Sequence, residues 1–342
     1  MSADLISAFV VTNPARLSCC LFLFLINSPI LVLGSVGDRS PYFNDCVVKC
    51  KELKCSNSMK LKEFAHQQPL AYALAGWDCL DECRYDCMWS TVDAFVAHQV
   101  PVPQFYGKWP FIRLLGMQEP ASVLFSVLNL LGFLYMLQQL RLRLSPKGPM
   151  YRVWTCYAMI GIFGWSWSCI FHTRDTPLTE ASFSYLIYSF PFVFRICLCL
   201  KYYDPNLKLD YFCAFAGVLF AFYASLLRIF QLSPGGCALL SLPFLAYFLG
   251  HIGYLGFIKF DYGYNMMANV VVGVCNSLAW LAWCARTYQR SRSGHVIWCL
   301  LVVTGALLTL SLELLDFPPV WWALDAHALW HLSTSPLPFL WT

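Results

Sequence analysis

Three histidines in this sequence have the residue type and spacing of a metal site. His327 and His331 are four positions apart, so in a helix they share one face. His172 ends an earlier apolar run, and Ser168 precedes it by one helical turn. Asp210 begins a later apolar run. Polar side chains are costly inside a membrane and usually have a function there, so these five residues are the candidate site.

Three neutral imidazoles and a water molecule form a common catalytic zinc shell. Zinc lowers the pKa of its bound water toward about 7, which supplies a nucleophile near neutral pH. We therefore predict that His172, His327 and His331 bind one Zn²⁺ ion. Two catalytic residues are predicted beside them. Asp210 would orient or deprotonate the water, and Ser168 would hydrogen-bond the water or the developing oxyanion.

Each of these residues also has a simpler interpretation. A single histidine at a helix end is more often an interfacial residue, and Ser168 could bond its own helix backbone. A shared site is favoured because one topology, set by charges elsewhere, places all five residues and Asp325 on one side. His251 lies within another apolar run, away from these residues in sequence, and for it we expect a packing role.

The composition indicates a protein built mainly for lipid. Hydrophobic residues make up 58% of the 342 positions and charged residues only 12%, against about 25% charged in a soluble domain. The formal net charge is +4, and the basic residues fall in short clusters between apolar runs. This pattern gives no support to nucleic acid as a partner. We predict an all-α membrane protein.

Apolar runs of spanning length predict a seven-transmembrane helix bundle over residues 119–342. An eighth run, 183–200, is also apolar, but Pro191 and Arg195 interrupt it. The seven predicted spans are 119–140, 152–171, 210–230, 237–258, 265–285, 296–315 and 319–341.

Basic residues orient these helices, because they favour the cytosolic side. If the N-terminal region is lumenal, the clusters at 141–152 and 286–292 and the single Arg228 all become cytosolic. A crossing by the run 183–200 would carry the last cluster into the lumen. We therefore predict that an insertion at about 181–207 does not span the membrane.

Residues 1–35 have the pattern of a signal peptide. Arg16 precedes the apolar stretch from Leu17 to Leu33, and small residues follow at Gly34 and Ser35. The alternative is an uncleaved signal anchor, because the apolar stretch is long for a signal.

Residues 36–118 are predicted to form a small lumenal head rich in cysteine. Six cysteines form two triplets, spaced mainly by four positions, which places each triplet on one helix face. An oxidising lumen favours disulfides, with a zinc cluster as the alternative. The sequence leaves many pairings open. Two antiparallel helices would join Cys46 to Cys87, Cys50 to Cys83 and Cys55 to Cys79.

The sequence around these residues resembles the Per1-like family, from about residue 37 to residue 333 apart from the insertion. The likeness is carried by Gln104–Phe111, Trp167–Thr176, Leu209–Phe212, Phe260–Asn269 and Leu324–His331.

The resemblance implies membership of the CREST superfamily of seven-span, metal-dependent membrane hydrolases. The shared pattern of that superfamily is Ser-x-x-x-His, a later Asp, and His-x-x-x-His. It falls here on Ser168 and His172, on Asp210, and on His327 and His331.

The resemblance also implies a function: removal of the sn-2 fatty acid from the lipid of GPI-anchored proteins, by ester hydrolysis. The implied partners are GPI-anchored proteins, their lipid moiety and other membrane lipids. The implied compartment is the Golgi membrane, with the endoplasmic reticulum as a second. A ceramidase-like amidase and a non-catalytic, metal-stabilised membrane receptor or chaperone are the alternative functions.

Two segments depart from the family pattern. Asp210 follows His172 by 38 positions, which corresponds to an insertion of about 27 residues. A lineage-specific isoform and a misjoined gene model are the alternatives for its origin. The second departure is Ser333–Thr342, which replaces a longer family tail and contains two prolines that disfavour a full last helix.

Overall fold

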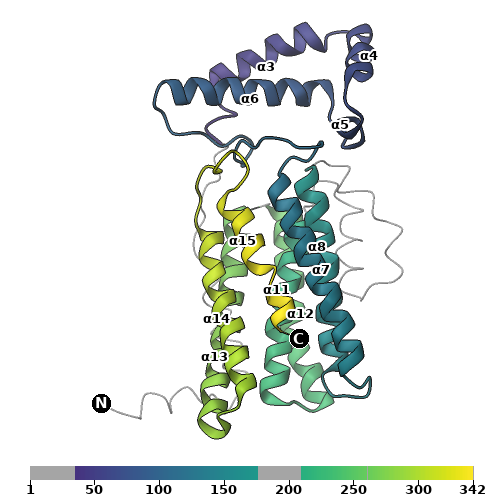
Figure 1. Ribbon diagram of the computed structural model, residues 1–342, viewed down its shortest axis with the longest axis vertical. Helices are drawn as coiled ribbons and strands as arrows, with labels where there is room; N and C mark the ends of the chain where they lie inside the picture. The colour runs from purple at the N-terminus through teal and green to yellow at the C-terminus, as the bar shows by residue number, and fades with distance from the viewer. Residues whose placement is uncertain (1–34, 176–208, 260, 342) are drawn as a thin grey trace.

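The computed structural model describes residues 35–175, 209–259 and 261–341, without the side chains of Leu209 and Asp210. The predicted signal peptide, up to residue 34, and the predicted insertion lie outside these residues. Over the described part of the chain the protein is all-helical, as predicted. Figure 1 shows a helical head lying across one end of a bundle of long helices.

The head consists of two antiparallel helices joined by three disulfides, as predicted. Helix α3 (Pro41–Lys54) packs against α6 (Cys79–Ala97), and α4 (Ser58–Gln67) and α5 (Leu70–Leu74) connect them. Asp78 caps the start of α6, because its carboxylate accepts a hydrogen bond from the Asp81 backbone N–H. The disulfides join Cys46 to Cys87, Cys50 to Cys83 and Cys55 to Cys79.

Specific contacts fix the head on the end of the bundle. The Trp77 indole donates a hydrogen bond to the Gly116 carbonyl at 2.8 Å. The Arg174 guanidinium lies 3.4 Å from the centre of the Trp77 ring and donates to Asp81 at 2.6 Å. The Trp109 indole donates to Asp316 at 2.6 Å. Trp77 and Arg174 are buried. These contacts therefore hold the segment 98–119, which links α6 to the first bundle helix, over the end of the bundle.

Six of the described helices are long and apolar enough to cross a membrane, and they correspond to the first six predicted spans. Contacts join α7 to α8, α8 to α11, α11 to both α12 and α13, and α13 to α14. Gly161 allows α7 and α8 to approach closely, because a Cβ there would overlap the Phe133 ring. The six are α7 (Pro120–Arg143), α8 (Tyr151–Thr173), α11 (Leu209–Phe230), α12 (Pro234–Gly253, continued by a π-helical turn to Ile258), α13 (Tyr262–Ser291) and α14 (Gly294–Leu314).

The seventh predicted span, 319–341, is not one continuous helix. It contains the short helices α15 (Ala326–Thr334) and α16 (Leu337–Leu340). Pro336 lies at the break and, like every proline, lacks the backbone N–H that helix continuation requires. At about 1.5 Å per residue, α15 is far shorter than the bilayer core. Both short helices pack on α7 inside the bundle.

The end of α8 and the start of α11 lie at the same end of the bundle, beneath the head (Figure 1). The rings of Phe171 and Tyr211 are 5.9 Å apart, and Tyr211 is 5.9 Å from Tyr262 at the start of α13. A single crossing between α8 and α11 would place these two helix ends at opposite ends of the bundle.

The basic residues in the last turns of α7, α11 and α13 lie at the end of the bundle opposite the head. The non-spanning insertion stays a prediction.

Candidate metal centre

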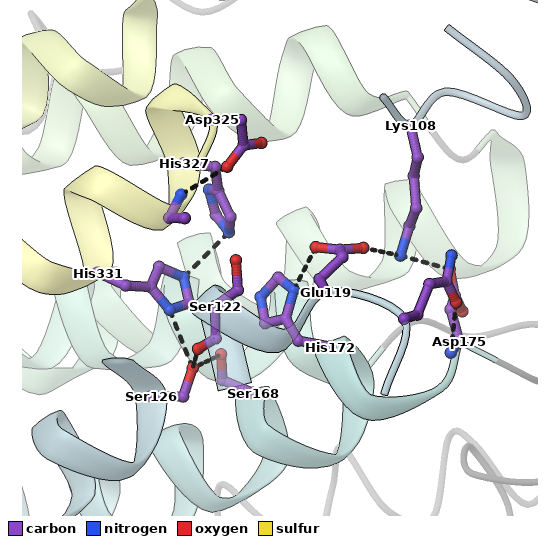
Figure 2. A network of polar contacts seen from close by, with 12 residues as sticks. Lys108, Glu119, Ser122, Ser126, Ser168, His172, Asp175, Asp325, His327 and His331 are labelled. Atoms are coloured by element: carbon purple, nitrogen blue, oxygen red, sulfur yellow. Dashed lines mark hydrogen bonds and ion pairs between the residues drawn. The ribbon is translucent and has the colours of Figure 1, made fainter. Parts of the chain in front are cut away.

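The three predicted histidine ligands converge at the head end of the bundle. His172 lies in the last turn of α8, while His327 and His331 lie on α15. One ring nitrogen from each lies within 4.8 Å of the others, and the Nε2 atoms of His327 and His331 are 3.0 Å apart. His172 and His331 are buried. The rings face a common point in Figure 2.

Each histidine has its Nδ1 atom bonded to a side chain from another helix or from a helix end. Such a partner fixes the tautomer and ring orientation and leaves Nε2 as the coordinating atom. The three pairs are His172 with Glu119 Oε2 at 2.7 Å, His327 with Glu313 Oε2 at 2.9 Å and His331 with Ser126 Oγ at 2.9 Å.

The arrangement fits a metal ion that accepts imidazole nitrogen. Nε2 of His172 is buried and has no hydrogen-bond partner among the described residues. A buried polar atom without a partner is costly, and a metal at the shared point would satisfy it. Three imidazole nitrogens with oriented rings are also the donor set of open, catalytic zinc sites.

The head contributes a charge to this centre through Lys108. The Lys108 ammonium lies 2.7 Å from Glu119 Oε1 and 3.5 Å from Asp175. Burial raises the pKa of Glu119, but the neighbouring Lys108 ammonium lowers it, and the pKa lies below its usual range. Glu119 is therefore an ionised acceptor for the His172 ring, held in place from the other side by the head.

Replacing Glu119 with glutamine should weaken zinc binding by about 10- to 100-fold, the usual effect of losing an outer partner of a ligating histidine. A chelator competition on purified protein measures this affinity. Glu82→Gln is the matched control, because Glu82 forms a bidentate ion pair with Arg113 in the head and contacts none of the histidines. Equal zinc affinity in wild-type and Glu119→Gln protein would contradict the assignment.

The predicted catalytic residues lie at this end of the bundle but in different surroundings. Ser168 is buried, and its hydroxyl lies 3.0 Å from Ser126 Oγ, on the Nδ1 side of the His331 ring. Asp210 lies in the first turn of α11, and its side chain is outside the described part of the structure. Asp325 caps α15 by accepting from the Ala328 N–H at 2.8 Å.

His251 has a packing role, as expected. Its ring stacks on Phe215 with 3.8 Å between centroids, and its Nε2 lies 3.2 Å from Asn265 Oδ1. It is buried between α11, α12 and α13 and takes no part in the three-histidine group.

Sequence reasoning did not find the partners of the histidines. Glu119 and Glu313 lie at the ends of apolar runs, where a rare acidic residue is the signal that could have marked them as functional. Ser126 carries no such signal, because serine is common in membrane helices, and its contact with His331 depends on how α15 packs on α7.

The fold and this centre define a multi-pass membrane protein with a buried three-histidine site beneath a disulfide-bonded head. A model of the Per1-like family matches residues 69–203 and 200–342. Together with the relatives below, this match shows that the chain belongs to the Per1-like family. No solved structure matches the chain.

The curated relatives match nearly the whole chain. The chain is 43% identical to the Mus musculus "GPI-specific phospholipase A2-like PGAP3" over 305 residues, which is 89% of this chain and 86% of the mouse protein. It is 41% identical to the Homo sapiens protein of the same name, covering 92% of this chain and 90% of that one. It is 39% identical to the Drosophila melanogaster "Post-GPI attachment to proteins factor 3", covering 99% and 93%.

Proposed function

We propose that this protein remodels GPI anchors by hydrolysing the sn-2 acyl ester of their lipid in a zinc-dependent reaction. The observation that carries the proposal is the convergence of His172, His327 and His331, each with Nδ1 held by a partner. The names of the mouse and human relatives, which describe a GPI-specific phospholipase A2-like protein, support the substrate class.

The side chains that surround the histidines serve to hold this centre rigid. Glu119, Glu313 and Ser126 fix the three rings, and the Lys108 ion pair fixes Glu119. A bound zinc ion would supply a water nucleophile near neutral pH and polarise the ester carbonyl. Rigid ligands keep this geometry ready before the substrate binds.

The hydrolysis needs a proton acceptor and a proton donor. We assign the acceptor to Asp210, which lies in the first turn of the helix that packs beside His172's helix. Water adds its oxygen to the acyl carbon, the ester C–O bond breaks, and the proton passes to the glycerol oxygen. The products are a free fatty acid and a lyso-form of the anchor. Ser168 supports the site through its hydrogen bond with Ser126.

The proposed location is the Golgi membrane, with the head in the lumen. The site lies at the head end of the bundle (Figure 1), so this orientation places it on the same side as GPI-anchored proteins. The basic ends of α7, α11 and α13 would then be cytosolic.

Glycosylation reports this orientation directly. An Asn-x-Thr acceptor inserted between Arg292 and Gly294, in the turn between α13 and α14, should stay unmodified. Met59→Thr creates an acceptor at Asn57 on the exposed surface of the head, which should be glycosylated. The opposite result at either position would contradict the proposed topology.

Lipid analysis in cells tests the function. GPI-anchored proteins from cells that lack this protein should keep the unsaturated sn-2 chain, and re-expression should remove it. A His327→Ala chain that restores remodelling would instead favour the receptor or chaperone. Unchanged anchors together with raised ceramide would favour the amidase.

A further inference from the structure

Polar residues at the start of α7 lie on the side of the metal centre. Ser122, Ser126 and Asn129 are separated by four and three positions, so they share one face of α7, and Glu119 is the N-cap residue that precedes this helix. This face meets α15: Asn129 donates to the His331 carbonyl at 2.7 Å, and Ser126 Oγ lies 2.9 Å from His331 Nδ1.

Ser122 is the residue of this face whose hydroxyl forms no hydrogen bond within the described residues. It is 1% exposed, and its Oγ has no hydrogen-bond partner in the described part of the chain. Serine hydroxyls in membrane helices usually bond to the carbonyl one turn earlier, as Ser126 does to Ser122 and Ser166 does to Ile162. Leaving a buried hydroxyl unpaired costs free energy, so a purely structural role does not explain it.

The neighbours of Ser122 define where its hydroxyl points. Glu119, one turn earlier, bonds the Nδ1 edge of His172, and Ser126, one turn later, bonds the Nδ1 edge of His331. Ser122 lies between them, opposite the gap between the two rings. Figure 2 shows its side chain directed toward the space that the three imidazoles share.

Ser168 lies in a different position. Its hydroxyl is bonded to Ser126, which lies on the Nδ1 side of His331, away from the Nε2 atoms. Ser122 is therefore the better placed hydroxyl for a group that reacts among the three Nε2 atoms.

We propose that Ser122 is a further catalytic residue, whose hydroxyl donates a hydrogen bond to the oxygen that gains negative charge when the ester is attacked. This inference rests on the proposed acyl-ester hydrolysis. No bond to Ser122 forms or breaks, since the hydroxyl acts only as a donor. Donors aimed at a developing oxyanion are among the largest contributors to catalysis.

Ser122→Ala in the full-length purified protein tests the inference. Turnover should fall by about 100-fold, the usual effect of removing one oxyanion donor. Zinc content should stay at the wild-type value, and thermal stability should not fall, because the substitution breaks no side-chain hydrogen bond. Ser225→Ala is the matched control: Ser225 is equally buried in α11 but bonds only the Phe222 carbonyl of its own helix. It should keep full turnover.

A binding measurement separates this inference from the proposed function. Acetohydroxamate, titrated into the cobalt-substituted protein and followed by absorbance, should bind about ten-fold more weakly to Ser122→Ala than to wild type, because a hydrogen bond to a charged group is lost. Equal affinity for acetohydroxamate, or equal turnover, would overturn the role of Ser122. A wild-type protein that releases no acyl chain overturns the proposed function, and the acetohydroxamate comparison then still decides whether Ser122 faces the ligand.

Discussion

A His172→Ala chain is expected to lose its turnover by at least about 10³-fold, because a catalytic metal supplies several kcal/mol of transition-state stabilisation. His172 is the one ligand that comes from α8, so its loss leaves only the pair on α15. Release of the sn-2 fatty acid by purified protein in mixed micelles measures the effect.

The control for this variant is His251→Phe. His251 is also buried in the bundle, and phenylalanine keeps its ring stacked on Phe215. We expect this protein to retain its zinc and its turnover. If His172→Ala kept wild-type turnover, the three-histidine centre could not be the catalytic site.

Removing one disulfide of the head should lower the free energy of unfolding of the head by about 2 to 3 kcal/mol, because the two retained disulfides already restrict the unfolded chain. The variant is Cys50→Ser with Cys83→Ser, whose sulfurs close a separation of 33 residues between α3 and α6. Protease resistance of the head, followed as denaturant is raised, measures the loss.

The matched control for this variant is Cys156→Ser, because Cys156 is a free cysteine in α8. Unfolding of the head should also weaken zinc binding. Lys108, in the segment that joins the head to the bundle, forms the ion pair that holds Glu119 in place. Unchanged protease resistance in the Cys50→Ser, Cys83→Ser protein would show that this disulfide contributes nothing to the head.

Local spacing explains why some features could be predicted from the sequence. The spacing of the cysteines, mainly four positions, places them on one side of each head helix, and antiparallel packing is the arrangement that joins them as observed. The same repeat places His327 and His331 together on α15. The apolar runs predict the first six long helices because length and hydropathy alone define a span.

Features that depend on packing could not be predicted in this way. The seventh run is broken into α15 and α16, and α15 is positioned by its contacts with α7 and α14. Glu119 and Ser126 contact histidines 53 and 205 positions away. A local sequence pattern does not predict contacts between residues so far apart in the chain. The partners of the three imidazole rings are therefore identified only from the packed helices.

The metal content of the purified full-length protein tests the central claim most directly. Wild-type protein should contain about one zinc ion per chain, as three histidines that form one site require. The His327→Ala, His331→Ala double variant should contain none, because His172 alone cannot hold the ion. A double variant that folds and retains zinc at the wild-type ratio would contradict the proposed centre.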